Sequence, residues 1–190
     1  MRIGILGGTF NPIHNGHIKI AQEAYKRLKL DKVIFMPAYI PPHKEANELV
    51  NAEDRLKMVE IAIAGREGFG ASRYEIDKEG KSYTVETIKY LKKAYPADTE
   101  FLFLMGADSL QSFDFWKDKE EMLSLCKFVV FNRRHFAVKA KYANIINCID
   151  IDPIDISSTD IRKSVKENKS IAELVPGAVA AYIKDKNLYK

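Results

Sequence analysis

The sequence has few cysteines, and their spacing excludes the classes of protein that depend on them. Only two of the 190 residues are cysteines, Cys126 and Cys148, and no CxxC or Cys/His pair has the spacing of a metal site. We therefore expect neither a disulfide framework nor a structural zinc site. Each cysteine stands at an apolar stretch, which favours two buried free thiols in a reducing compartment.

The sequence also lacks a long apolar run and a strong excess of charge of one sign. No stretch reaches the roughly 20 apolar residues of a membrane-spanning helix, and Gly7-Gly8 cuts the first apolar run short of a signal-peptide core. We therefore expect a cytoplasmic protein with no membrane partner. The 30 basic and 26 acidic residues give a net charge of +4. That charge does not indicate a nucleic-acid partner, but it is compatible with a small anionic ligand in a local basic pocket.

What the sequence does have is a regular alternation of apolar strands and helical patterns. Its 190 residues, 46% hydrophobic and 29% charged, suit a single domain spanning 1–190. The alternation predicts an α/β fold with a Rossmann-like, doubly wound and mainly parallel sheet that has helices on both faces. The strands are expected at 2–6, 32–36, 71–76, 100–105, 127–131 and 145–151. The helices are expected at about 16–28, 51–64, 82–94, 107–113, 117–125, 157–167 and 176–186.

The segment after the first expected strand, 7–17 (GGTFNPIHNGH), is the first candidate site. Ligands of parallel sheets bind beyond the carboxyl ends of the strands, and its two glycines would let the backbone approach phosphates closely. His14 and His17 stand three residues apart where a helix begins, so both can point at one ligand. The unsatisfied N–H groups of a helix N-terminus favour phosphate there. The alternatives are a solvent-exposed pair or a metal site, although no Asp or Glu partner lies in this loop.

A second candidate site lies far along the chain, at 156–162 (ISSTDIR). Ser157 and Asp160 make a start similar to a capping box, so one interpretation is only a well-capped helix. The other interpretation rests on Ser158, Thr159 and Arg162, which cluster in the first helical turn. Their hydroxyls and guanidinium, with the free backbone N–H groups, could bind a second anion.

These two segments resemble the signatures of a nucleotidyltransferase superfamily, HxGH and ISSTxxR. The resemblance implies that His14 and His17 bind the phosphates of ATP and stabilise the transition state. It also implies that two helix N-termini face one triphosphate, with the C-terminal helices from about 157 completing the ATP site. The ATP-binding residues that it implies are Gly7, Gly8, Thr9, Phe10, Ser157, Ser158 and Thr159.

Further segments resemble one branch of this superfamily, the bacterial nicotinate mononucleotide adenylyltransferases. The first is the proline loop 41–44 (PPHK) after the second strand, which on its own would be a stiff loop with an exposed lysine. The resemblance makes Lys44 a phosphate-contacting residue. It would act with His14, His17 and Arg162 in neutralising the charge on the phosphates.

Two more segments of this branch would hold the mononucleotide. In 82–84 (SYT) the serine is a candidate N-cap, and the resemblance implies that Thr84 helps to hold the nicotinate carboxylate. In 105–109 (MGADS), Asp108 is either an N-cap or a partner for a ribose hydroxyl, as acidic residues are in nucleotide sites. Trp116 would be a core residue by default, whereas the family uses a tryptophan here to stack on the pyridine ring.

The sequence departs from the family pattern at one place. After the strand at 127–131 the family often has Arg-Pro-Gly, whereas this chain has Asn132-Arg133-Arg134-His135. Arg133 corresponds to the family's arginine and is a candidate mononucleotide-binding residue. The missing proline leaves the shape of its loop, and therefore its role, open.

The resemblance implies a reaction in which the phosphate of nicotinate mononucleotide attacks the α-phosphorus of ATP. The products would be pyrophosphate and nicotinate adenine dinucleotide, the precursor of NAD. Magnesium is expected, bound through the ATP phosphates rather than in a carboxylate cage. The alternatives are a nicotinamide mononucleotide or phosphopantetheine adenylyltransferase, or a non-catalytic nucleotide-binding regulator. The sequence does not decide the oligomeric state, and it is compatible with a homo-oligomer.

Overall fold

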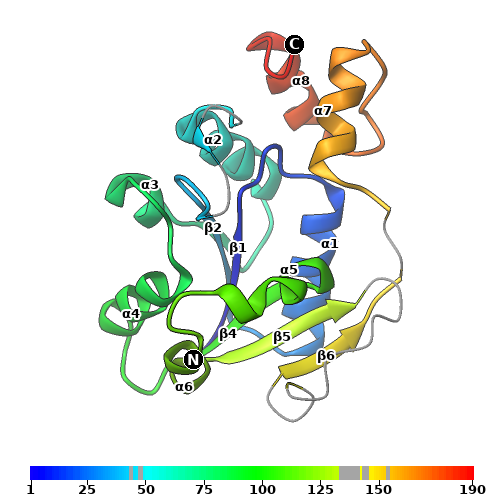
Figure 1. Cartoon of the computed structure of the whole chain (residues 1–190). Coiled ribbons are helices and arrows are strands. Elements are labelled where there is room, and N and C mark those ends of the chain that lie inside the picture. The colour runs from blue at the N-terminus through cyan, green and yellow to red at the C-terminus, as the bar shows by residue number, and fades with distance from the viewer. Residues whose placement is uncertain (43–44, 47–48, 133–141, 143–145, 153–154) are drawn as a thin grey trace.

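A six-stranded parallel sheet forms the centre of the molecule (Figure 1). The computed structural model describes residues 1–42, 45–46, 49–132, 142, 146–152 and 155–190. Within them the strand order is β3-β2-β1-β4-β5-β6, and every neighbouring pair is parallel. This topology confirms the predicted Rossmann-like fold. The strands are β1 (Arg2–Gly8), β2 (Lys32–Pro37), β3 (Phe69–Ala71), β4 (Glu100–Gly106), β5 (Lys127–Asn132) and β6 (Ile146–Asp150).

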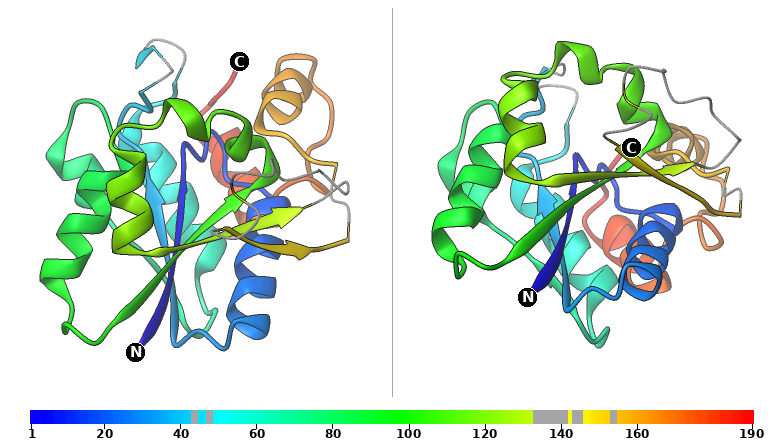
Figure 2. Two further views of the ribbon diagram at one scale, coloured as in Figure 1. Left: turned by 60° about the horizontal axis from the view of Figure 1, so that its bottom comes forward. Right: turned by 90° about the horizontal axis from the view of Figure 1, so that it is seen from below.

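Helices cover both faces of this sheet, because the strands carry apolar side chains on both sides. On β1, Ile3 and Ile5 point to one face and Leu6 to the other, and all three are buried. The helices are α1 (Asn15–Arg27), α2 (Ala52–Ile63), α3 (Tyr74–Lys78), α4 (Thr84–Ala94), α5 (Ala107–Gln111), α6 (Lys119–Leu125), α7 (Ser158–Lys166) and α8 (Gly177–Asp185), with a 3-10 helix η2 (Phe113–Phe115). Helices α1, α2, α7 and α8 pack on the Leu6 face, and α4, α5 and α6 pack on the other (Figure 2).

The strand expected at 71–76 is wrong. β3 ends at Ala71, where its pairing with β2 ends, and the chain then forms α3. Tyr74 and Ile76 alternate with polar residues as a half-buried strand would, but Glu75 between them is also buried, at 8% exposed. Glu75 and Ile76 are thus buried next to each other, whereas an alternating half-buried strand would bury only every second residue. The other elements lie within about two residues of their expected ranges, as is usual for predicted element ends.

The two cysteines differ in exposure, so the prediction of two buried thiols is wrong for one of them. Cys126 is buried next to β5, and burial raises the pKa of its thiol to about 12. Cys148 lies in β6, the edge strand of the sheet, and is exposed. In the part of the chain that the structure describes, no helix is both long enough and apolar enough to cross a membrane.

Candidate active site

The loop between β1 and α1 carries the first predicted site and follows a central strand. Phe10 has a positive φ of 49°, and the peptide bond between Asn11 and Pro12 is cis. The Phe10 side chain is buried, and a Cβ atom on Gly8 would lie only 3.0 Å from its ring. A side chain at this position would therefore need the buried Phe10 ring to move by a few tenths of an ångström. The loop ends at His14, which is the N-cap of α1.

The two histidines of the HxGH segment lie against each other. The ring centroids of His14 and His17 are 3.7 Å apart, and the rings are stacked at 29°. The backbone N–H of His14 donates to Nδ1 of His17 at 3.2 Å. Because Nδ1 accepts this bond, the neutral His17 imidazole carries its proton on Nε2 and presents that N–H as a donor. The spacing therefore predicted correctly that the two side chains come together.

The second signature segment docks directly on the HxGH loop. Ser158 donates from its hydroxyl to the carbonyl of Pro12 at 2.9 Å, and Arg162 donates from Nη1 to the carbonyl of Asn11 at 2.9 Å. Thr159 stands beside them, with its hydroxyl 3.3 Å from Nη2 of Arg162. The N-terminus of α7 thus fixes the loop that the histidines follow, although almost 150 residues separate the two segments.

The start of α7 is capped as the sequence predicted. The Ser157 hydroxyl accepts a hydrogen bond from the backbone N–H of Asp160 at 3.1 Å and donates to its carboxylate at 2.6 Å. The capped-helix interpretation and the site interpretation therefore do not compete. Ser157 caps the helix, while Ser158 and Arg162 contact the loop.

The N-terminus of α1 offers fewer free donors than the sequence suggested. The backbone N–H of Asn15 donates to the carbonyl of Leu174 at 2.9 Å, and the side-chain amide of Asn15 donates to Glu173 at 3.0 Å. The N–H of His17 donates to the carbonyl of His14. Part of the donor capacity expected for a phosphate is thus already used. The imidazole side chains become more important for binding an anion there.

Two of the four residues predicted to hold the mononucleotide, Thr84 and Trp116, lie in neighbouring segments on the opposite face of the sheet. Thr84 is the first residue of α4, and Trp116 directly follows η2. The two segments touch where the ammonium of Lys117 lies 4.4 Å from the centre of the Tyr83 ring. The half-buried Trp116 ring packs edge to face on Phe103 at 5.9 Å. It is therefore neither a fully buried core residue nor a freely exposed one.

Ser82 does not cap α4, which corrects the sequence prediction. The N-cap is Tyr83, and the Ser82 hydroxyl accepts instead from the backbone N–H of Tyr39 at 2.9 Å. The same hydroxyl donates to the buried carboxylate of Glu75, which also accepts from the hydroxyl of Thr87. Burial raises the pKa of Glu75 above that of an ordinary glutamate, and the two hydroxyl donors partly oppose the shift. A tertiary partner has taken the place of the expected cap.

Arg55 contacts the HxGH loop, although no sequence pattern indicated a role for it. It lies on α2, is 1% exposed, and donates only to backbone carbonyls, one of which belongs to Thr9 in the HxGH loop. Burial lowers the pKa of its guanidinium to about 10, so it remains protonated at neutral pH. A single arginine beside the apolar stripe of a helix gives no sign of burial in a sequence.

The chain matches known proteins over nearly all of its length. The model of the cytidylyltransferase-like family matches residues 5–164. A protein of Clostridium novyi named "Probable nicotinate-nucleotide adenylyltransferase" is 43% identical over 197 residues, with 98% of each chain covered. A protein of the same name from Halalkalibacterium halodurans is 42% identical over 190 residues, with 100% of this chain and 91% of that one covered. The chain belongs to the nicotinate-nucleotide adenylyltransferase family.

Solved structures agree with this family in fold. The nicotinic acid mononucleotide adenylyltransferase of Plasmodium falciparum, complexed with NaAD, superposes with a TM-score of 0.80 at 20% identity, covering 99% of this chain and 97% of that chain. A second structure of the same enzyme, complexed with APC, gives the same TM-score. At this identity the likeness concerns the fold.

Three residues that the family resemblance places in the site are not described by the structure. Lys44 and Arg133 lie outside the described residues, and so does the side chain of Asp108, whose backbone is part of α5. Their predicted roles in this adenylyltransferase family stay predictions.

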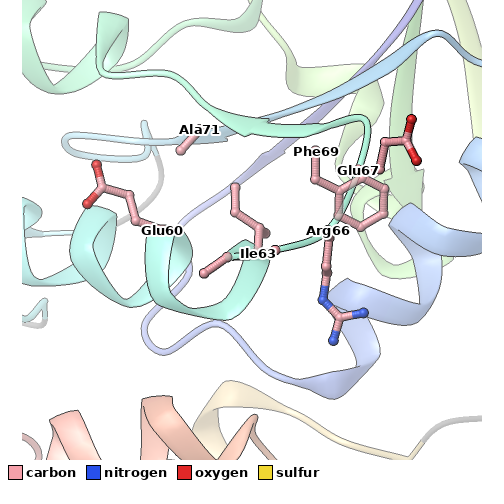
Figure 3. A pocket seen from close by; sticks show the side chains of 8 residues that line it. Glu60, Ile63, Arg66, Glu67, Phe69 and Ala71 are labelled. Atoms are coloured by element: carbon pink, nitrogen blue, oxygen red, sulfur yellow. The ribbon is translucent and has the colours of Figure 1, made fainter.

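Two of the hollows on the described surface differ in their relation to the candidate site, because the first borders it and the second does not. The first, about 550 Å³, is lined by residues 49–50, by Thr159, Arg162 and nearby lysines of α7, and by Tyr189. The second, about 580 Å³, lies between the end of α2 and the edge strand β3 (Figure 3). Charged side chains of both signs, from Glu60, Arg66 and Glu67, surround it, and it contains none of the residues predicted for a nucleotidyltransferase site.

Proposed function

We propose that the chain transfers the adenylyl group of ATP to nicotinate mononucleotide in the biosynthesis of NAD. The observation that carries this proposal is the docking of α7 on the HxGH loop, where Ser158 and Arg162 hold the loop carbonyls. The two signature segments are thereby brought into one site. Relatives 43% and 42% identical over nearly the whole chain, named nicotinate-nucleotide adenylyltransferases, support the choice of acceptor.

The reaction is an in-line displacement at the α-phosphorus of ATP. A phosphate oxygen of nicotinate mononucleotide forms the new bond to phosphorus as the bond to pyrophosphate breaks. The attacking phosphate is already an anion at neutral pH, so no general base is needed. Catalysis then rests on positioning the two substrates and on stabilising the charge that develops on the phosphates.

The donors for this charge come from both signature segments. The Nε2–H of His17 is fixed by the hydrogen bond that Nδ1 accepts from the His14 backbone. His14, Arg162 and Lys44 are the other groups that we propose for the triphosphate. Gly7, Gly8, Thr9, Phe10, Ser157, Ser158 and Thr159 complete the proposed ATP site.

The acceptor is proposed to bind on the other side of the site. Trp116 would stack on the pyridine ring, and Thr84 would hold the nicotinate carboxylate. Asp108 and Arg133 are the further proposed contacts. The half-buried position of Trp116 supports the stacking role, because part of the ring lies outside the core.

Magnesium is proposed as the metal of the reaction, carried by the ATP phosphates and water. Mg²⁺ keeps several waters in such sites and is bound largely by substrate oxygens. Across the described ranges, no three His, Cys, Asp or Glu side chains gather into a group that could hold a metal ion. When bound, the ion would neutralise the charge of the phosphates. A cytoplasmic location stays a prediction, and the sequence is compatible with a homo-oligomer without deciding the oligomeric state.

The experiment that tests the proposal compares acceptors. Pyrophosphate release is measured with ATP and magnesium in the presence of nicotinate mononucleotide, nicotinamide mononucleotide or phosphopantetheine. We expect a strong preference for the nicotinate form. Equal use of the two pyridine mononucleotides would contradict the specificity, and release with phosphopantetheine alone would contradict the acceptor. No release with any acceptor, despite ATP binding, would favour a nucleotide-binding regulator.

A further inference from the structure

Arg55 is the most deeply buried charged side chain in the described structure, with 1% of its surface exposed. Four of its five N–H groups have acceptors, and every acceptor is a backbone carbonyl. A guanidinium is costly to bury unless its donors are satisfied. In the described structure no carboxylate pairs with it, so its hydrogen-bond acceptors are carbonyls, and Tyr189 adds a smaller electrostatic contribution. These hydrogen bonds therefore explain how the charged side chain of Arg55 can be buried.

The four carbonyls belong to three separate segments. Nη1 donates to Thr9, in the HxGH loop, at 2.8 Å and also to Ala38, just after β2. Nη2 donates to Tyr39 at 2.7 Å, and Nε donates to Val50, just before α2, at 2.9 Å. The fork thus joins the carboxyl ends of two neighbouring strands, β1 and β2, where parallel sheets bind their ligands.

The segment that Arg55 holds is tied on its other side to the predicted mononucleotide site. The N–H of Tyr39 donates to the Ser82 hydroxyl at 2.9 Å, and the N–H of Ser82 donates to the carbonyl of Ile40 at 2.9 Å. Ser82 is followed by Tyr83 and then by Thr84, the first residue of α4. A continuous line of hydrogen bonds therefore runs from the HxGH loop, through Arg55 and Tyr39, to the start of α4.

We propose that Arg55 is a positioning residue that sets the ATP half of the site against the mononucleotide half. This inference rests on the proposed function, because it assigns the alignment of the two substrates to one side chain. In-line displacement depends on that alignment, and a shift of about 1 Å can cost about 100-fold in rate. Arginine suits this task because its rigid planar fork reaches several carbonyls at once, whereas a lysine ammonium donates from a single point.

The test separates positioning from simple stabilisation of α2. Arg55→Lys keeps the charge and loses the fork. Met58→Ala removes a fully buried side chain from the same helix and leaves all four bonds in place. Unfolding temperature, kcat, both KM values and the affinity for a non-hydrolysable ATP analogue are measured for each variant, well below its unfolding temperature.

We expect Arg55→Lys to lower kcat by about 100-fold while each KM changes by a much smaller factor. Met58→Ala should lower the unfolding temperature while it leaves kcat within about twofold, since its cost is that of a core cavity. Equal kcat values for the two variants would overturn the inference. So would an Arg55→Lys enzyme whose kcat is that of the unmodified chain.

A second variant tests the same line of bonds from its other end. Ser82→Ala removes the acceptor of the Tyr39 N–H, and its effect on kcat should be less than additive with that of Arg55→Lys. Additive effects would contradict a shared role. Should Arg55→Lys not fold, Ser82→Ala alone must lower kcat more than KM, or the inference fails.

The failure of the proposed function would look different from the failure of this inference. If the unmodified chain formed no dinucleotide, the proposed function would be wrong. The inference would then be judged by the imidazole NMR signals of His14 and His17 in the HxGH loop, which we expect Arg55→Lys to shift and Met58→Ala to leave unchanged. Unshifted signals in Arg55→Lys would overturn it.

Discussion

The two halves of the candidate site are held in place by different kinds of contact. On the ATP half, the loop at 9–14 receives hydrogen bonds on its carbonyls from Arg55, Ser158 and Arg162, all of 2.9 Å or less. On the mononucleotide half, hydrogen bonds hold the segment before α4, whereas Trp116 rests mainly on neighbouring phenylalanine rings and donates one long hydrogen bond of 3.4 Å to Ser112. Hydrogen bonds are directional, whereas apolar contacts are not. We therefore expect a rigid ATP half and a mononucleotide half in which the Trp116 ring adapts to its ligand.

The largest expected effect lies on the rigid half. His17→Ala should lower kcat by about 100- to 1,000-fold, because it removes a preorganised donor from the phosphates. The KM for ATP should change much less, since the other donors of the loop remain. Steady-state kinetics on the folded variant checks this. Lys19→Ala, on the same helix, is the control and should keep normal turnover. Near-normal turnover of His17→Ala would contradict the role of His17 as a preorganised donor on the ATP half.

A smaller effect is expected on the adaptable half. Trp116→Ala should raise the KM for nicotinate mononucleotide by about tenfold, a change that fits the loss of one stacking contact. The KM for ATP should stay the same, and Trp116→Phe should recover most of the loss because it keeps a ring. Kinetics with each substrate varied in turn provides the measurement. An equal rise in both KM values would mean that the halves are not separate.

Two glutamates, Glu75 and Glu86, test the packing that stabilises the mononucleotide half. Burial raises the pKa of Glu75, so above the ordinary pKa of a glutamate the folded chain binds a proton that the unfolded chain has lost. Stability then falls as pH rises through this window. Glu75→Gln removes this loss and should gain stability relative to the unmodified chain as the pH rises above the ordinary pKa of a glutamate.

Glu86 is the matched control and should show the opposite sign. Hydrogen bonding to Lys78 lowers the pKa of Glu86, so its stabilising effect is present at higher pH and is lost as pH falls. Glu86→Gln should therefore be less stable than the unmodified chain at pH 8, with the difference shrinking at low pH. Urea unfolding at several pH values measures both variants, and the same sign for both would contradict this account.

The smallest effect concerns the cysteines, which compare the inside and the edge of the sheet. Cys148 is exposed on β6, whereas Cys126 is buried and its pKa is raised to about 12. A thiol reagent should therefore modify one thiol per native chain, and the second only after unfolding. Cys148→Ser should remove the fast reaction. Two fast thiols in the native chain would contradict the burial of Cys126.

Much of the fold could be predicted from the sequence because its strands are apolar on both faces and its helices are periodic. The segment at 71–76 could not, because the alternation of Tyr74 and Ile76 fits a strand as well as it fits α3. The burial of Glu75 distinguishes the helix from a strand. It depends on hydrogen bonds from Ser82 and Thr87, which come later in the sequence.

The candidate site also has one part that the sequence predicts and another that depends on the tertiary fold. The pairing of His14 with His17 follows from their spacing, because residues three apart at a helix start lie together. The contacts of Arg162 and Arg55 with loop carbonyls depend on the tertiary fold, and neither can be found from local pattern. The residues that flank an arginine in the sequence do not show whether its side chain is buried or exposed.

The most direct test of the account follows the α-phosphate itself. The chain is incubated with magnesium, nicotinate mononucleotide and ATP labelled at the α-phosphorus, and the products are separated. The account predicts that the label moves into nicotinate adenine dinucleotide, with one unlabelled pyrophosphate released for each dinucleotide formed. Pyrophosphate release without a labelled dinucleotide, or no transfer by a chain that binds ATP, would contradict it.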